Sequence, residues 1–189
     1  MAMGNQHEEH DPREEYEWVA LGDLTSEDHE RLAAALVRWV EANPIWHDGA
    51  GERVLLVDLD NLRAGPLRWK ARMMLVVALA RTADHVVISG HTTAVERGRE
   101  HLAEFAEVAQ PVPDGADLAD LKLLEGAEAV TAERRQVVVL SNDGIFSSLA
   151  ERGPLTVLSP GASALSDRLF DAARVVIDLM TLEERLAPA

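Results

Sequence analysis

Residues 54–62 read Val-Leu-Leu-Val-Asp-Leu-Asp-Asn-Leu, and the architecture of the chain can be inferred outward from them. Four consecutive β-branched or leucine side chains form a short apolar run, typical of a strand buried on both faces. The run ends in two acids and an amide, Asp58, Asp60 and Asn61. Parallel sheets present functional groups at the carboxyl ends of their strands. The stretch therefore predicts a central strand with polar groups at one edge of a sheet.

Strand-like and helix-like segments alternate along the chain from residue 53. Apolar runs predict strands at 53–59, 85–90, 107–112, 136–141, 155–158 and 174–178. Helical patterns lie between them at 66–82, 92–105, 117–133, 144–152 and 163–173. Such alternation indicates a mainly parallel sheet covered by helices on both faces. We therefore expect an α/β fold with three α/β/α layers over residues 53–180.

The flanking segments have a different character. Residues 1–17 are polar and rich in acids, which predicts a disordered acidic tail. Residues 18–52 predict a helical extension and a linker, with a helix over 25–46 whose apolar side chains recur at helical spacing. Residues 181–189 are expected to form a carboxyl-terminal tail. The amphipathic helix is expected to dock on the body, or to bind a second copy of the chain or another protein.

Composition excludes several classes of protein. The 189 residues include no cysteine, which excludes disulfides and thiolate metal sites and fits the reducing cytoplasm. The apolar run at residues 73–80 is too short to span a membrane. A net charge of −15 argues against a general nucleic-acid coat protein. We therefore expect a cytoplasmic protein with no membrane contact.

Three groups of acids are expected at the carboxyl edge of the sheet. Asp58 and Asp60 end the first strand, three aspartates lie at the start of the 117–133 helix, and Asp143 follows the strand at 136–141. Clustered carboxylates repel one another unless a cation lies among them. Oxygen ligands without a His or Cys motif indicate Mg²⁺ or Mn²⁺. The aspartates near the helix start are Asp114, Asp117 and Asp120.

These motifs resemble those of the NYN branch of the PIN-like nucleases. The resemblance lies in Asp58-x-x-Asn61-Leu62, in Asp117, and in Leu-Ser-Asn-Asp143-Gly-x-Phe over residues 140–146, and it covers about residues 53–180. It implies a Mg²⁺- or Mn²⁺-dependent ribonuclease in which acids hold the metal and a bound water attacks the phosphodiester. It also implies that Asp58, Asp117 and Asp143 are catalytic metal ligands, with Asp60 as a further ligand and Asn61 near the metal or phosphate.

One position departs from the family pattern. The family often has a further acid two residues after its last aspartate, and this chain has Ile145 there. Asp60 or Asp120 could compensate for the missing acid. The departure also fits a degenerate domain that binds RNA or protein without cutting.

Further residues are expected to bind the RNA substrate. Residues 62–83 contain five Lys or Arg and no acid, so basic side chains could position an RNA backbone beside the acids, with Trp69 either stacking on a base or buried in the core. Polar residues after the second and fourth strands are expected to line the same crevice. The predicted substrate-binding residues are Asn61, Arg63, Arg68, Lys70, Ser89, His91, Ser141 and Asn142, with Arg72 in the same basic stretch.

A second enzyme class fits part of the pattern. Asp58-Leu-Asp60 also looks like the nucleophile motif of haloacid-dehalogenase-type phosphatases, in which Asp58 would form an aspartyl-phosphate. Ser89, Lys122 and Asp143 would then be the supporting groups. Against this, Asn61-Leu62 replaces the usual Gly or Thr, Lys122 lies inside a predicted helix, and the chain leaves little room for a cap.

Overall fold

The computed structural model describes residues 26–47, 51–115, 117–130 and 134–187. The predicted acidic tail over residues 1–17 lies outside these parts of the chain. Within them, no helix is both long and apolar enough to cross a membrane.

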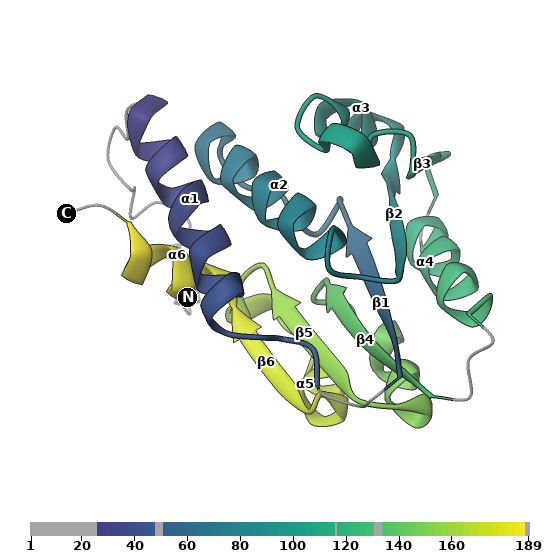
Figure 1. Ribbon diagram of the computed structural model, residues 1–189. Coiled ribbons are helices and arrows are strands. Elements are labelled where there is room, and N and C mark those ends of the chain that lie inside the picture. Colours follow the sequence, from purple (N-terminus) through teal and green to yellow (C-terminus); the bar gives the residue numbers. More distant parts are fainter. Residues whose placement is uncertain (1–25, 48–50, 116, 131–133, 188–189) are drawn as a thin grey trace, which may run out of the picture.

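Six strands form one sheet in the order β3-β2-β1-β4-β5-β6, and each neighbouring pair is parallel (Figure 1). The predicted mainly parallel α/β fold is therefore confirmed. The strands are β1 Glu52–Asp58, β2 His85–His91, β3 Ala109–Val112, β4 Arg135–Leu140, β5 Leu155–Ser159 and β6 Val175–Asp178.

Helices connect the strands, and several are shorter than predicted. The 92–105 segment divides into α3 and a 3₁₀ turn, and the 163–173 segment divides in the same way. The 144–152 segment is a 3₁₀ helix. The elements are α1 Ser26–Ala42, α2 Pro66–Ala80, α3 Thr92–Arg99, η1 Ala103–Phe105, α4 Leu118–Glu128, η2 Gly144–Arg152, η3 Ala162–Ala164, α5 Asp167–Ala172 and α6 Leu179–Leu186.

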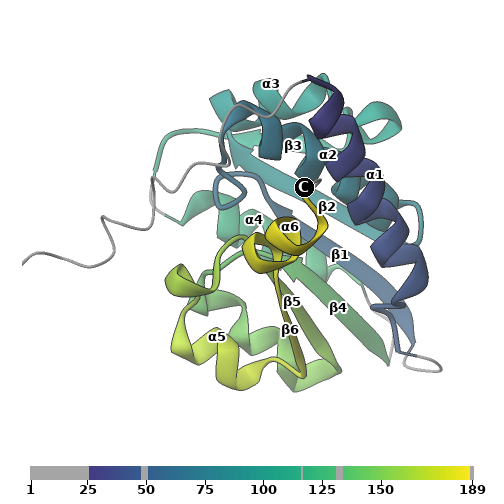
Figure 2. The ribbon, with the colours of Figure 1, turned by 90° about the vertical axis from the view of Figure 1, so that its left-hand side faces the viewer.

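The alternation of β1 side chains explains the three layers. Leu55 and Val57 pack into one buried cluster with α1, α2, α3 and α6. Val54 and Leu56 point to the opposite face and pack with α4, η2 and α5. Because successive strand residues face opposite sides, a continuous apolar run is needed where both faces are covered. Figures 1 and 2 show the two layers of helices on either side of the sheet.

The two helices outside the predicted domain belong to the core. α1 lies against α2 and α6 (Figure 2). Its side chains Leu32, Leu36 and Val40 are buried in the same cluster as Leu55 and Val57, so its apolar face is docked on the body. The prediction of a tail over residues 181–189 is corrected, because α6 continues to Leu186 and buries Glu183 completely.

The strand order reverses between β1 and β4. The chain builds outward from β1 through β2 to β3, then crosses back beside β1 to form β4, and continues to β5 and β6. Ligands of open α/β sheets bind outside the carboxyl ends of the strands where the order reverses in this way. Asp58 ends β1, and Ser141 directly follows β4. The fold therefore brings the predicted acids to its reversal point.

Candidate functional site

Asp58 organises the floor of the site. Its Oδ1 accepts hydrogen bonds from the backbone N–H groups of Asp60 at 3.1 Å and Asn61 at 3.2 Å. Its Oδ2 accepts from Ser141 Oγ at 3.0 Å and from Asn61 Nδ2. The residue is 1% exposed, and burial raises the pKa of its carboxyl group against the hydrogen bonds from Asn61 and Ser141. Both carboxylate oxygens of Asp58, the first predicted metal ligand, thus already accept hydrogen bonds from the protein.

Asp60 is paired with His91 from the end of β2. Its Oδ2 accepts a hydrogen bond of 2.8 Å from the backbone N–H of His91. The same oxygen lies 2.8 Å from His91 Nδ1. The hydrogen bond and the charge of Asp60 raise the pKa of the His91 imidazole. Asp60 Oδ1 is buried without a hydrogen bond and lies 3.8 Å from the Arg63 guanidinium. Asp60 therefore orients the predicted substrate-binding residues His91 and Arg63 as well as facing the pocket.

Among the acids of the site, Asp120 has the most strongly shifted pKa. It is buried, and no hydrogen bond or ion pair to its carboxylate occurs among the described residues. Burial raises its pKa to about 7, with further contributions, in decreasing order, from the negative charges of Asp58, Asp143, Asp117 and Asp60. The sequence predicted Asp120 only as a possible substitute. The available signal was its place in the first turn of the predicted 117–133 helix, close to Asp117 in sequence.

Asp117 and Asp143 stand at the starts of helical segments. Asp117 is the N-terminal cap position of α4 and has a left-handed backbone, with φ of 60°. Asp143 caps η2, where its Oδ1 accepts from the backbone N–H of Ile145 at 3.0 Å. The Asp143 N–H donates in turn to Ser141 Oγ at 3.1 Å. The Asp143 carboxylate therefore has a local structural role, whereas the Asp117 side chain makes no capping hydrogen bond. Both acids act electrostatically on Asp120.

A small open cavity of about 80 Å³ lies over these acids. A cavity needs about 10–15 Å³ of such space to hold one water, so this one has room for several waters. Asp143, Ser141 and Asn142 are not part of its lining. The residues that line it are Asp58, Asp60, Asn61, His91, Gly115, Asp117, Ala119 and Asp120.

The donor set fits a hydrated cation better than a closed metal cage. Among the residues that the structure describes, no three His, Cys, Asp or Glu side chains are grouped so that they could hold one ion directly. Mg²⁺ commonly keeps several waters and is held through one or two carboxylates together with substrate phosphates. Asp120, with its unused carboxylate among four other acids, has the chemistry for this form of binding.

Like Ser141, which is fully buried and donates to Asp58, two further predicted substrate-binding residues are used within the protein. Ser89 is fully buried, and its Oγ donates to the carbonyl of Gln110 on β3 at 3.1 Å. Asn142 is also buried; its Oδ1 accepts from Ser159 Oγ at 2.6 Å, and its Nδ2 donates to the Gly161 carbonyl at 3.3 Å. The structure therefore places both beside the crevice and gives their side chains intramolecular partners.

The basic stretch after β1 does not form one surface. Arg63 is exposed beside Asp60, but Arg72 is buried and forms an ion pair with Glu183. Arg68 lies 3.6 Å from Glu183, and Lys70 lies 3.9 Å from Glu30 of α1. The expectation that Arg72 contacts RNA is therefore corrected, because its guanidinium is enclosed between α2 and α6.

Trp69 lies in the core rather than on an RNA-binding surface. It is buried in the cluster that contains Leu55 and Val57. The guanidinium of Arg97 lies 4.7 Å from the centroid of its ring. Of the two alternatives open from the sequence, the structure thus selects core packing for this side chain.

The phosphatase groups are not assembled at Asp58. Lys122 is partly exposed on α4, with Nζ 3.5 Å from the Glu125 carboxylate, and it does not line the cavity. The Ser89 hydroxyl is directed to Gln110. An aspartyl-phosphate site would need a cation and a hydroxyl next to the nucleophile, and these two residues are engaged elsewhere.

Comparison with known proteins adds little to this geometry. No protein-family model matches the chain, and no curated protein matches it. The chain is similar to the crystal structure of a protein of unknown function from Vibrio parahaemolyticus, at 18% identity and a TM-score of 0.45. The match covers 70% of this chain and 95% of that chain.

Proposed function

We propose that this protein is a cytoplasmic, metal-dependent ribonuclease of the NYN and PIN-like type. The observation that supports the proposal is Asp120, a buried carboxyl group whose pKa is raised to about 7 among four further aspartates. The acids lie at the carboxyl edge of the sheet, near the point where the strand order reverses between β1 and β4. Such a cluster is unfavourable by itself and becomes favourable when a divalent cation compensates its charge.

Asp117 and Asp120, which line the cavity, would hold Mg²⁺ or Mn²⁺. Asp143 lies outside the lining and would act on the ion through water and through its charge. When bound, the ion would lower the pKa of a water and neutralise charge that develops on the phosphate. Asp58 holds Asn61 and Ser141 in place through its hydrogen bonds.

Two side chains near the acids, His91 and Arg63, would contact the RNA. Asp60 orients the ring of His91 at the cavity. Arg63 exposes its guanidinium beside Asp60, where it would contact an RNA phosphate.

The position of the missing family acid is consistent with this assignment. Ile145 packs against the apolar cluster that contains Phe146 and Leu149. An acid there would have to be accommodated beside apolar side chains. Asp120 supplies a carboxylate to the same group of acids from α4 instead.

A second candidate is a non-catalytic module that binds RNA or protein. It is favoured by Ile145 and by the lack, among the described residues, of a group of three acids able to hold an ion directly. If α1 binds a second copy of the chain or another protein, it would use its outer face, because Leu32 and Leu36 are covered by the body.

The test is to incubate the purified full chain with mixed RNA in Mn²⁺, Mg²⁺ or EDTA. We expect RNA loss that requires the cation and that is abolished by Asp120→Asn and by Asp143→Asn. Asp171→Asn, on the exposed surface of α5, is the matched control and should cut like the wild type. RNA binding without RNA loss would instead support the binding module, and release of p-nitrophenol from p-nitrophenyl phosphate would support the phosphatase.

A further inference from the structure

Arg72 of α2 and Glu183 of α6 form a buried ion pair away from the acid cavity. Glu183 is 0% exposed and Arg72 is 2% exposed. Arg72 Nε lies 2.6 Å from Glu183 Oε1, and one terminal nitrogen lies 3.1 Å from Oε2. Burying two charges is costly, and apolar residues of similar volume often stabilise a fold as well or better. The pair therefore calls for an explanation other than stability.

Arg72 also holds the turn that follows β5. The nitrogen that contacts Glu183 donates a second hydrogen bond, of 2.9 Å, to the carbonyl of Pro160. Pro160 lies between Ser159 and Gly161, and the Gly161 N–H donates to Ser159 Oγ at 3.2 Å. The buried ion pair thus fixes the backbone of the Ser159–Gly161 turn from one side.

The other side of the same turn holds Asn142. Ser159 Oγ donates to Asn142 Oδ1 at 2.6 Å, and Asn142 Nδ2 donates to the Gly161 carbonyl at 3.3 Å. The Asn142 carbonyl accepts from the backbone N–H of Ser166 at 3.0 Å. Asn142 is therefore fixed through its side chain and through its main chain.

Asn142 connects this network to the acids. The residue before it, Ser141, donates to Asp58, and the residue after it, Asp143, acts electrostatically on Asp120. A continuous path of hydrogen bonds and short chain links therefore leads from α6 to the acid cluster.

We infer that Arg72 and Glu183 are positioning residues for the acid site, acting through the Ser159–Gly161 turn on Asn142 and thus on Asp143. The inference rests on the proposed function where it concerns catalysis. It makes α6 part of the functional unit, since the helix supplies the carboxylate that orients Arg72. Misplacing a catalytic group by about 1 Å can reduce turnover by roughly 100-fold.

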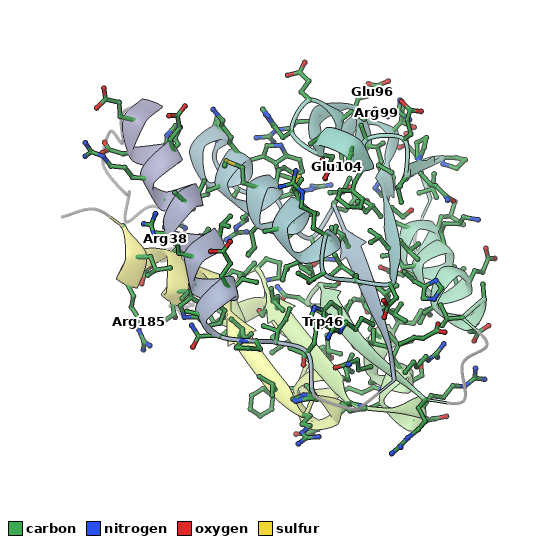
Figure 3. The ribbon with its side chains drawn as sticks, viewed as in Figure 1. Arg38, Trp46, Glu96, Arg99, Glu104 and Arg185 are labelled. Carbon is green, nitrogen blue, oxygen red and sulfur yellow. The ribbon has the colours of Figure 1, made fainter. Side chains whose placement is uncertain are left out.

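The test replaces the ion pair by apolar residues in Arg72→Met/Glu183→Leu. This change removes the hydrogen bond to Pro160 together with both charges of the buried pair. It also removes the carboxylate that faces Arg68, whose side chain is 22% exposed. We expect kcat on RNA to fall about 10- to 100-fold with a smaller change in KM, while the thermal midpoint stays within a few degrees of the wild type. Arg81→Gln/Glu104→Gln is the matched control, because Arg81 directly follows α2 and its bidentate pair with Glu104 (labelled in Figure 3) is exposed.

Hydrogen exchange tests the positioning without any activity. In the apolar double variant, we expect faster exchange at the Ser166 amide, which donates to Asn142, and at the Ile145 amide, which donates to Asp143. The amide of Val57 in β1 should keep its protection. Unchanged exchange at Ser166 and Ile145, together with unchanged kcat, would overturn the inference.

Ser159→Ala provides a second variant that changes only one atom in the middle of the path. It should lower kcat and speed amide exchange at Ser166 and Ile145, as the apolar double variant does. Combining the two changes should add little, because the effects of substitutions within one network are not additive. Fully additive losses would contradict a common path, and so would wild-type exchange in Ser159→Ala. If the wild-type chain cuts no RNA, the proposed function fails, and the exchange data alone decide the positioning.

Discussion

Ser141 Oγ donates a hydrogen bond of 3.0 Å to Asp58 Oδ2, which joins the ends of β4 and β1 where the strand order reverses. The bond makes Asp58 a structural organiser as well as a member of the acid site. Asp120 differs, since no protein group in the described chain donates a hydrogen bond to its carboxylate. The two aspartates should therefore respond in opposite ways to the same substitution.

Asp120→Asn is expected to stabilise the protein at alkaline pH. The folded-state pKa of Asp120 is raised from 3.8 to about 7, so between these values the folded chain holds a proton that the unfolded chain releases. This contribution to stability is fully present below about pH 4 and is lost as the pH rises through 7. In EDTA at pH 8, Asp120→Asn should raise the thermal midpoint by roughly 2–4 °C, equivalent to about 1 kcal/mol.

The same measurement at pH 5 is the control for Asp120, since the carboxyl group of the folded wild type is then protonated and the difference between the two midpoints should become smaller. Adding Mn²⁺ at pH 8 should raise the midpoint of the wild type more than that of Asp120→Asn. An equal difference between the two proteins at both pH values would contradict a raised pKa at this residue.

Asp58→Asn is expected to destabilise the protein. The new amide group places a donor where Asn61 Nδ2 and Ser141 Oγ now donate to a carboxylate. Leaving buried donors unsatisfied costs about 1–3 kcal/mol each, so chemical denaturation should show a lower free energy of unfolding. RNA cleavage should be lost as well. A stability equal to that of the wild type would show that the hydrogen bonds around Asp58 are replaceable.

Arg63→Ala and Arg68→Ala should differ in their effect on RNA. Arg63 is exposed beside Asp60, so its removal should raise KM several-fold and reduce the slope of log binding constant against log salt by about 1. Arg68 faces Glu183, and its removal should leave the salt slope unchanged. Arg99 is exposed on α3 (Figure 3), and Arg99→Ala is the control for loss of a surface arginine outside the site. Equal slopes for Arg63→Ala and the wild type would remove Arg63 from the RNA contact.

Leu36→Ala should show that α1 is part of the cooperative fold. Leu36 is fully buried in the cluster shared with α2, and deleting such a side chain costs about 2–5 kcal/mol. The denaturation transition should remain single and move to lower denaturant. Arg38→Ala, on the exposed side of the same helix (Figure 3), should change the midpoint little. A wild-type midpoint for Leu36→Ala would mean that α1 contributes nothing to the stability of the body.

Local sequence patterns predict the features that depend on a single helix or strand. The apolar run over residues 54–57 predicted a doubly covered strand, and all four side chains are 0% exposed. The spacing of Leu32 and Leu36 predicted an amphipathic helix with one buried face. The helix over 144–152 was placed correctly, but its 3₁₀ geometry has no clear sequence signature and was not predicted.

Contacts between distant elements explain what was missed. Arg72 lies in a stretch rich in basic residues, and nothing near it in sequence shows that Glu183, 111 residues later, encloses it. For the same reason, residues 181–186 looked like a polar tail. Asp120 was ranked below Asp117, since the burial that raises its pKa depends on how α4 lies against the sheet.

The sequence by itself determined the α/β fold, the parallel strands and the edge at which the acids gather, because the apolar periodicity and the polar ends of the strands are local properties. Only the tertiary structure decided what each polar group faces. In the folded chain, the Asp58 carboxylate accepts hydrogen bonds from Asn61 and Ser141, whereas the Asp120 carboxylate accepts none from the described residues. Arg72 is buried against Glu183. The physical reason is that burial and electrostatic coupling depend on distances between elements, which strand order and helix packing establish and which no single stretch of residues contains.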